Sequence, residues 1–183
     1  MNEPDLRRRV SAGYLHAAFV LACIGFLVGH GIYAAKINSV TVDEYVHLPA
    51  AVAIMQTGDI ELDHTGSPPM RAIGALPSVF QKPRMDYSDR AWKEKQTYRF
   101  SWLFMVNNVH RYHGLYFGAR MVMVAIAAAL AIFVYAAGRV TYGRTAAAGA
   151  VFLFCFNPEI LAHSSLMTVD VLVTCFFLPL FII

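Results

Sequence analysis

The side chains best suited to chemistry in the first half of the chain are Asp43, Glu44 and His47. On a helix, residues three or four positions apart lie on one face, so His47 would share a face with either acid. A carboxylate placed this way could act as a general base. A structural role fits equally well, because Thr41 and Glu44 have the spacing of a capping box, in which the glutamate returns a hydrogen bond to the helix start.

A second group lies late in the chain and consists of Glu159, His163 and Asp170. Both acids are expected near the ends of apolar segments. Ionisable residues at membrane depth cost about 3 kcal/mol on insertion scales, and they usually face a cavity or a partner. The structural alternative is that Asp170, with Thr168, only caps the start of the last apolar segment.

The segments that must position these groups are strongly apolar. Hydrophobic residues make up 57% of the 183 positions and charged residues only 15%, which is unlike a soluble domain. The composition and the long uncharged stretches predict an all-α integral membrane protein. We expect one membrane module with four spans, near residues 13–35, 121–137, 145–162 and 166–183, and a long outer loop at 36–120.

The distribution of arginines predicts the orientation. Arg7, Arg8 and Arg9 precede the first span, and Arg139 and Arg144 flank the short connection between the second and third. Short basic segments tend to face the cytoplasm, so the N-terminus is expected inside and the long loop outside. A signal peptide is the alternative for the first span, but its apolar run is too long for one.

This topology brings the two acidic groups together. The segment after the first span and the turn between the third and fourth spans would emerge on the same face of the membrane. Asp43 and Asp170 are therefore expected to meet there. Two carboxylates that converge at this surface could serve as a base and as an electrostatic or metal-binding partner.

The long loop is expected to return to the membrane. A helix from Asp43 to Gly58 should lie with its apolar face in the membrane interface. Further along, the aromatic residues between Trp92 and Phe104 suit the interface, where Trp and Tyr concentrate, although they could also stack on a sugar.

Other classes of function find little support. The net charge is only +3 and the basic residues of the loop alternate with acids, so no nucleic-acid-binding surface is expected. Cys23, Cys155 and Cys175 all lie in apolar segments without metal-binding spacing, and buried, inert thiols are expected.

Several short motifs, taken in order, resemble the N-terminal part of GT-C superfamily membrane glycosyltransferases. The resemblance is to bacterial relatives of protein O-mannosyltransferases and lipid A aminoarabinose transferases, which use polyprenyl-phosphate sugars. The motifs are Asp43-Glu44 with His47, Gly58-Asp59, Pro68-Pro69-Met70, Ala75-Leu76-Pro77, Ala119-Arg120, Tyr142-Gly143, Asn157-Pro158, Leu161-Ala162-His163 and Thr168-Val169-Asp170.

This resemblance implies transfer of a sugar from a polyprenyl-phosphate carrier to a hydroxyl of a lipid, glycan or protein. It implies that Asp43, with Glu44 beside it and Asp170 opposite, forms the catalytic group, and that Asp43 is the general base. Arg71 and Arg120, or a divalent metal ion, would neutralise the phosphate, and His47 and His163 are further substrate-binding candidates. The expected location is the bacterial inner membrane.

The chain also departs from that family. Relatives often carry an acid just before the proline pair, where this chain has Thr65-Gly66-Ser67, and this weakens the case for a metal there. They also have about a dozen spans, so we expect this sequence to be the N-terminal part of a longer chain. The alternative is a non-catalytic scaffold subunit that binds membrane protein partners. A transporter with a proton-relay carboxylate fits less well, because no acid lies in the middle of a span.

Overall fold

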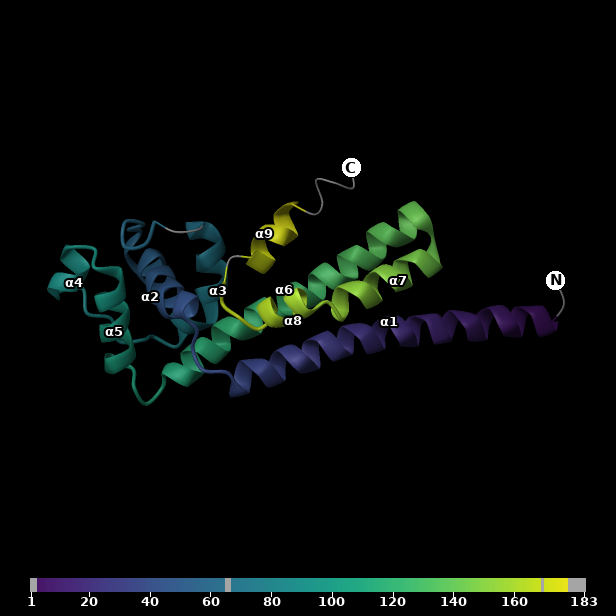
Figure 1. Cartoon of the computed structure of the whole chain (residues 1–183), viewed down its shortest axis with the longest axis horizontal. Helices are drawn as coiled ribbons and strands as arrows, with labels where there is room; N and C mark the ends of the chain where they lie inside the picture. Colours follow the sequence, from purple (N-terminus) through teal and green to yellow (C-terminus); the bar gives the residue numbers. More distant parts are fainter. Residues whose placement is uncertain (1–2, 65–66, 169, 178–183) are drawn as a thin grey trace.

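The computed structural model describes residues 3–64, 67–168 and 170–177, and this part of the chain folds into helices without any strand. In Figure 1, the helices at residues 3–37, 112–142 and 144–155 run side by side, and the helices between residues 42 and 107 gather at the end opposite the N-terminus. The helices are α1 (Glu3–Ile37), α2 (Val42–Thr57), α3 (Pro68–Phe80), α4 (Arg90–Lys93), α5 (Thr97–Asn107), α6 (Tyr112–Tyr142), α7 (Arg144–Cys155), α8 (Pro158–His163) and α9 (Asp170–Phe177).

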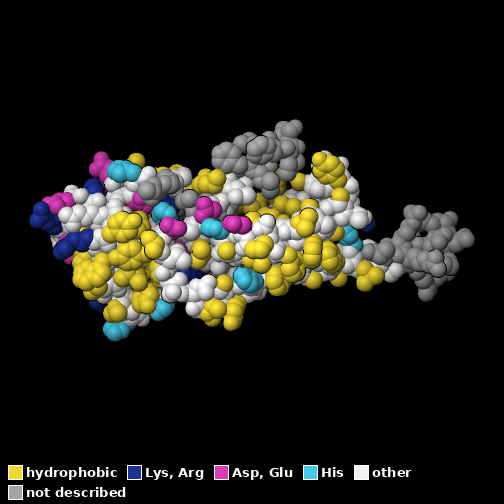
Figure 2. All heavy atoms as spheres, in the orientation of Figure 1, with side chains coloured by type: hydrophobic (Ala, Val, Ile, Leu, Met, Phe, Trp, Pro, Cys, Tyr) yellow, Lys and Arg dark blue, Asp and Glu magenta, His cyan; other side chains and the backbone are white. Residues whose placement is uncertain are grey.

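Among the residues that the structure describes, two helices are long and apolar enough to cross a membrane, namely α1 over Gly13–Ile37 and α6 over Tyr112–Tyr142. At 1.5 Å per residue, the shorter of these stretches is about 37 Å long and exceeds the ~30 Å hydrocarbon layer. They contain the predicted spans at 13–35 and 121–137. Hydrophobic side chains cover this long body in Figure 2, and charged side chains gather over the α2–α5 end.

The third and fourth predicted spans do not form comparable helices. Helix α7 has 12 residues, about 18 Å, and ends at Cys155. The break follows from Asn157 and Pro158: the Asn157 side chain accepts the backbone N–H of Glu159 at 2.8 Å and starts α8 with proline at its first position. The span predicted at 145–162 therefore does not form one continuous helix. Of the span predicted at 166–183, α9 forms one part, and residues 178–183 lie outside the described residues.

The predicted hairpin after the second span is confirmed. Gly143, at φ +87°, is the single residue between α6 and α7. A Cβ on Gly138 would lie 3.2 Å from the Cα of Ala147, so the two helices approach closely. Small residues allow such close packing between apolar helices. Helices α1, α6 and α7 share one core, which contains Val20, Cys23, Leu27, Ala127, Ala131, Ala148, Val151 and Cys155.

Helix α2 begins and ends where its sequence predicts. Thr41 and Glu44 form the complete capping box, and Gly58 ends the helix at φ +77°. The prediction that its apolar face lies in the membrane interface is wrong, because that face is covered by the protein. Leu48 and Val52 are fully buried in a core that α2 shares with α3, α5 and α6.

Candidate functional site

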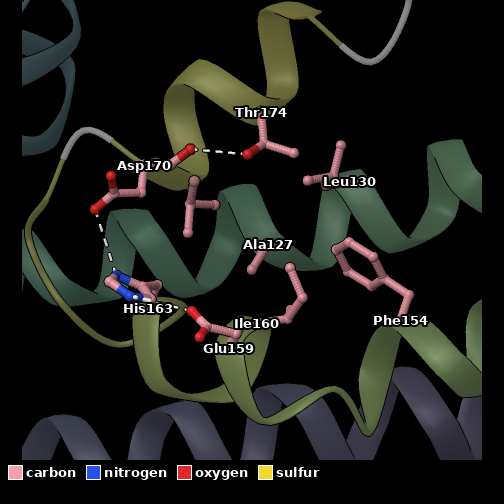
Figure 3. Close-up of a pocket in the computed structure, with 9 residues that line it drawn as sticks. Ala127, Leu130, Phe154, Glu159, Ile160, His163, Asp170 and Thr174 are labelled. Carbon is pink, nitrogen blue, oxygen red and sulfur yellow. Dashed lines mark hydrogen bonds and ion pairs between the residues drawn. The ribbon is translucent and has the colours of Figure 1, made fainter.

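The second acidic group assembles as the sequence suggests. His163 lies between two carboxylates, with Nδ1 3.3 Å from Oδ2 of Asp170 and Nε2 3.8 Å from Oε2 of Glu159. Figure 3 shows the three side chains at the rim of a cavity of about 250 Å³. Its other lining residues are Ala127, Leu130, Phe154, Ile160, Val171 and Thr174. The cavity therefore has a polar rim and an apolar floor.

Thr168 does not cap the start of α9 through its side chain. Its hydroxyl is buried and has no hydrogen-bond partner in the described part of the chain. The Asp170 side chain is 59% exposed and faces His163. Asp170 is thus accessible from outside the protein.

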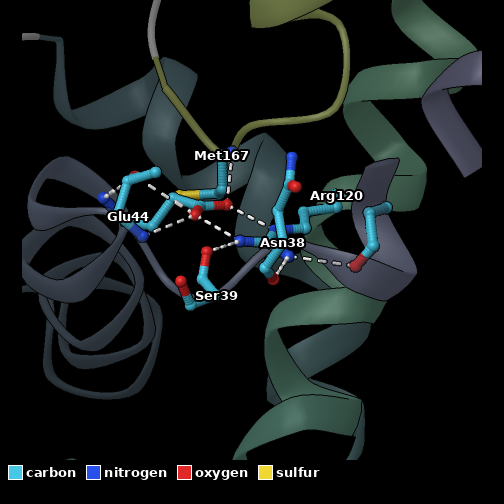
Figure 4. A network of polar contacts seen from close by, with 7 residues as sticks. Asn38, Ser39, Glu44, Arg120 and Met167 are labelled. Carbon is cyan, nitrogen blue, oxygen red and sulfur yellow. Dashed lines mark hydrogen bonds and ion pairs between the residues drawn. The ribbon is translucent and has the colours of Figure 1, made fainter. Parts of the chain in front are cut away.

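The first acidic group divides into two different environments. Glu44 is fully buried and forms a two-pronged ion pair with Arg120, with Nε to Oε1 at 2.7 Å and Nη2 to Oε2 at 2.6 Å (Figure 4). Asp43, its neighbour, is exposed. Within the described ranges, Asp43 makes no side-chain hydrogen bond or ion pair. Of Asp43 and Glu44, Asp43 is therefore the acid that a substrate can reach.

The remaining N–H groups of the Arg120 guanidinium donate to backbone carbonyls at and just beyond the end of α1. Nη1 donates to the carbonyls of Ala35 at 2.9 Å and Asn38 at 2.8 Å, and Nη2 donates to that of Ser39 at 2.9 Å. With the two bonds to Glu44, all five N–H groups of the side chain have acceptors. The expectation that Arg120 binds the phosphate of the sugar donor does not fit this arrangement, because no N–H group of its guanidinium remains without an acceptor.

The Glu44 carboxylate also accepts hydrogen bonds from two backbone N–H groups. The backbone N–H of Met167 donates to its Oε1 at 3.0 Å, and the backbone N–H of Thr41 donates to Oε2 at 3.1 Å. Burial alone would raise the pKa of Glu44, but the hydrogen bonds from Arg120, Met167 and Thr41 and the charge of Arg120 hold that pKa below its ordinary value. A carboxylate with a lowered pKa that already accepts these hydrogen bonds does not suit the role of a proton acceptor, and Glu44 instead holds the surrounding segments together.

His47 and Arg71 belong to a separate network inside the α2–α5 cluster. Asp63 lies between them, with its Oδ2 3.2 Å from His47 Nδ1 and in an ion pair with Arg71 Nη1. Arg71 is 1% exposed, and burial lowers its pKa while the charge of Asp63 opposes that shift. Asp63 thus engages both side chains. In the described part of the chain His47 does not pair with Asp43 or Glu44, and the guanidinium of Arg71 is buried.

A second cavity, of about 290 Å³, opens between the end of α1 and the start of α6. Lys36 and His113 are exposed at its edge, and Arg120 lies at its base. No acid is among its lining residues, which are Ala35, Lys36, Asn38, Val40, His113, Gly114, Tyr116, Phe117 and Arg120. This cavity was not predicted from the sequence, although Lys36 directly follows the first predicted span and His113 lies a few residues before the second.

Within the ranges that the structure describes, no three His, Cys, Asp or Glu side chains converge in a way that could hold a metal ion. Cys23 and Cys155 are buried free thiols, and Cys175 is a partly buried one. Comparisons with protein-family models, curated proteins and solved structures found no match to this chain.

Proposed function

We propose that this chain is the N-terminal part of a GT-C type membrane glycosyltransferase that transfers a sugar from a polyprenyl-phosphate carrier to a hydroxyl acceptor. The main support is the hydrogen bond from the Met167 backbone to Glu44. It joins the turn before α9, which begins at Asp170, to the first turn of α2, which carries Asp43. Two of the motifs that suggested the family, Asp43-Glu44 and Thr168-Val169-Asp170, come from these two segments.

In this proposal Asp43 is the general base. It lies in the first turn of α2, which the capping box and the Glu44–Arg120 pair hold in place. The Asp43 carboxylate would take the proton of the acceptor hydroxyl while that oxygen attacks the anomeric carbon. The new carbon–oxygen bond would form as the bond from the anomeric carbon to the lipid phosphate breaks, and the lipid phosphate would leave with its charge.

Asp170 would act from the cavity that it lines with His163 and Glu159. Asp43 is not among the described residues that line this cavity. We therefore assign substrate positioning to Asp170 and His163. Proton abstraction from the acceptor hydroxyl is assigned to Asp43. The apolar floor formed by Leu130, Phe154 and Ile160 suits a lipid-borne substrate.

The phosphate would lie in the cavity between α1 and α6. Lys36 and His113 replace Arg71 and Arg120 as its direct contacts in this proposal, because the two arginines are buried in ion pairs. A positive group beside the leaving phosphate stabilises the charge that develops there. The proposed setting is the bacterial inner membrane with the N-terminus in the cytoplasm.

The test is Asp43→Asn in the complete protein, assayed in membranes for transfer of labelled sugar from a polyprenyl-phosphate donor. Loss of a general base typically lowers the rate by about 10²–10⁴-fold. Glu94→Gln removes another exposed carboxylate and should leave transfer unchanged. Full activity of the Asp43→Asn variant would exclude the base role.

The buried Glu44–Arg120 pair also suits a non-catalytic scaffold, since it fixes helices without offering any group to a substrate. The same assay separates the two functions. A scaffold would show no sugar transfer in the unmodified protein, and Asp43→Asn would leave its assembly with membrane partners intact.

A further inference from the structure

Helix α5 presents an unusual outer face. Phe100, Ser101 and Phe104 are buried against the rest of the α2–α5 cluster. On the opposite face, Tyr98 is 67% exposed, Trp102 55% and Val106 47%. Positions 98, 102 and 106 are four apart and form one stripe along the helix. Figure 2 shows hydrophobic side chains gathered over this helix.

The apolar stripe continues to the start of a candidate membrane span. Val109 is 56% exposed, and α6 begins at Tyr112. A helix whose exposed face carries Trp, Tyr and Val, and which lies next to a span, is suited to the boundary between headgroups and acyl chains.

A group of cations lies at the same corner. Lys82, Arg84 and Arg111 are all exposed. In the described part of the chain none of the three forms an ion pair. Asp86, the acid nearest in sequence to Lys82 and Arg84, accepts hydrogen bonds from Ser88 and from the backbone of Asp89.

The fold holds these cations in place. The side chain of Asn108, which is 1% exposed, accepts the backbone N–H of Arg84 at 2.9 Å and donates to its carbonyl at 2.9 Å. The guanidinium of Arg111 donates to the carbonyl of Gln81. The segment before α4 is thereby fixed against the corner between α5 and α6, beside the apolar stripe.

We propose that this corner binds the headgroups of anionic phospholipids, with the α5 stripe inserted among the lipids and Lys82, Arg84 and Arg111 facing their phosphates. Charge complementarity and continuity with α6 both select this partner. A soluble acidic protein would leave the Tyr98–Trp102–Val106 stripe in water. Each cation near an anionic surface contributes about a fivefold preference.

The test uses the whole chain reconstituted in vesicles, with Trp92→Phe so that Trp102 is the single tryptophan. Brominated phosphatidylglycerol or brominated phosphatidylcholine is included at equal mole fraction, and quenching of Trp102 fluorescence is measured. We expect quenching by both lipids, with phosphatidylglycerol enriched on the order of tenfold around Trp102.

The variant Lys82→Gln/Arg84→Gln should lose most of this enrichment and keep the quenching by brominated phosphatidylcholine. The matched variant Arg90→Gln/Lys93→Gln removes two exposed cations from α4 and should keep the enrichment. The proposal would be overturned if neither lipid quenched Trp102. It would also be overturned if both lipids quenched Trp102 equally in the protein that keeps all its cations, or if the two charge variants lost the enrichment equally.

Discussion

The backbone N–H of Met167 donates to Oε1 of Glu44 at 3.0 Å, across 123 positions of the sequence. The same carboxylate pairs with Arg120, whose guanidinium holds three carbonyls at and just beyond the end of α1. One buried anion therefore joins α2, α6, the end of α1 and the turn before α9. The positions of Asp43 and Asp170 depend on this junction.

Removal of Arg120 should disrupt this junction. Arg120→Ala would leave Glu44 as an unpaired buried charge and three carbonyls without their donor. A broken buried pair typically costs about 3–5 kcal/mol, so thermal unfolding in detergent, followed by circular dichroism, should shift well below that of the unmodified protein. Arg99→Ala, at an exposed position on α5, should shift it little. Equal stability of the two variants would contradict the structural role of the pair.

The stability of the protein should depend on Glu44 in acid. Because the pKa of Glu44 is held below its ordinary value of about 4.3, the unfolded chain takes up this proton before the folded one does. The stabilisation is complete above that value and is lost as the pH falls through the lower pKa of the folded state. The unfolding temperature of the unmodified protein should therefore fall more steeply below pH 4 than that of Glu44→Gln. Parallel pH profiles would show that Glu44 does not carry the effect.

The network around Asp63 should stabilise the α2–α5 cluster independently of the site. Asp63→Asn leaves the buried guanidinium of Arg71 without its counter-charge, and we expect faster proteolysis within residues 42–107. Adding Arg71→Met to Asp63→Asn should restore part of the resistance, since both charges are then gone. His64→Gln, at an exposed neighbouring position, serves as the control. A double variant no more resistant than Asp63→Asn alone would argue against the pairing.

Local signals in the sequence predicted part of this structure. The capping box at Thr41 and the glycine at position 58 set the ends of α2, and Gly143 set the hairpin. The break between α7 and α8 had a signal too, because Asn157 followed by Pro158 is a typical helix start. Hydropathy favoured one continuous span across it and gave the wrong result.

The buried ion pairs could not be predicted in the same way. Glu44 and Arg120 are 76 positions apart, and no local pattern links them. An arginine near the start of an apolar helix can either pair with a buried acid or extend its charged end to the membrane interface. Only the packing of α2 against α6 decides between these two, and with it which of Asp43 and Glu44 stays accessible.

The most direct measurement asks whether Asp43 and Asp170 reach the same side of the membrane. Asp43→Cys, Asp170→Cys and Thr141→Cys are made one at a time after Cys23, Cys155 and Cys175 are replaced by alanine, and intact cells are treated with a membrane-impermeant maleimide. Labelling of positions 43 and 170 in intact cells, with position 141 labelled only after permeabilisation, is the predicted result. Labelling of 43 and 170 from opposite sides would contradict the account.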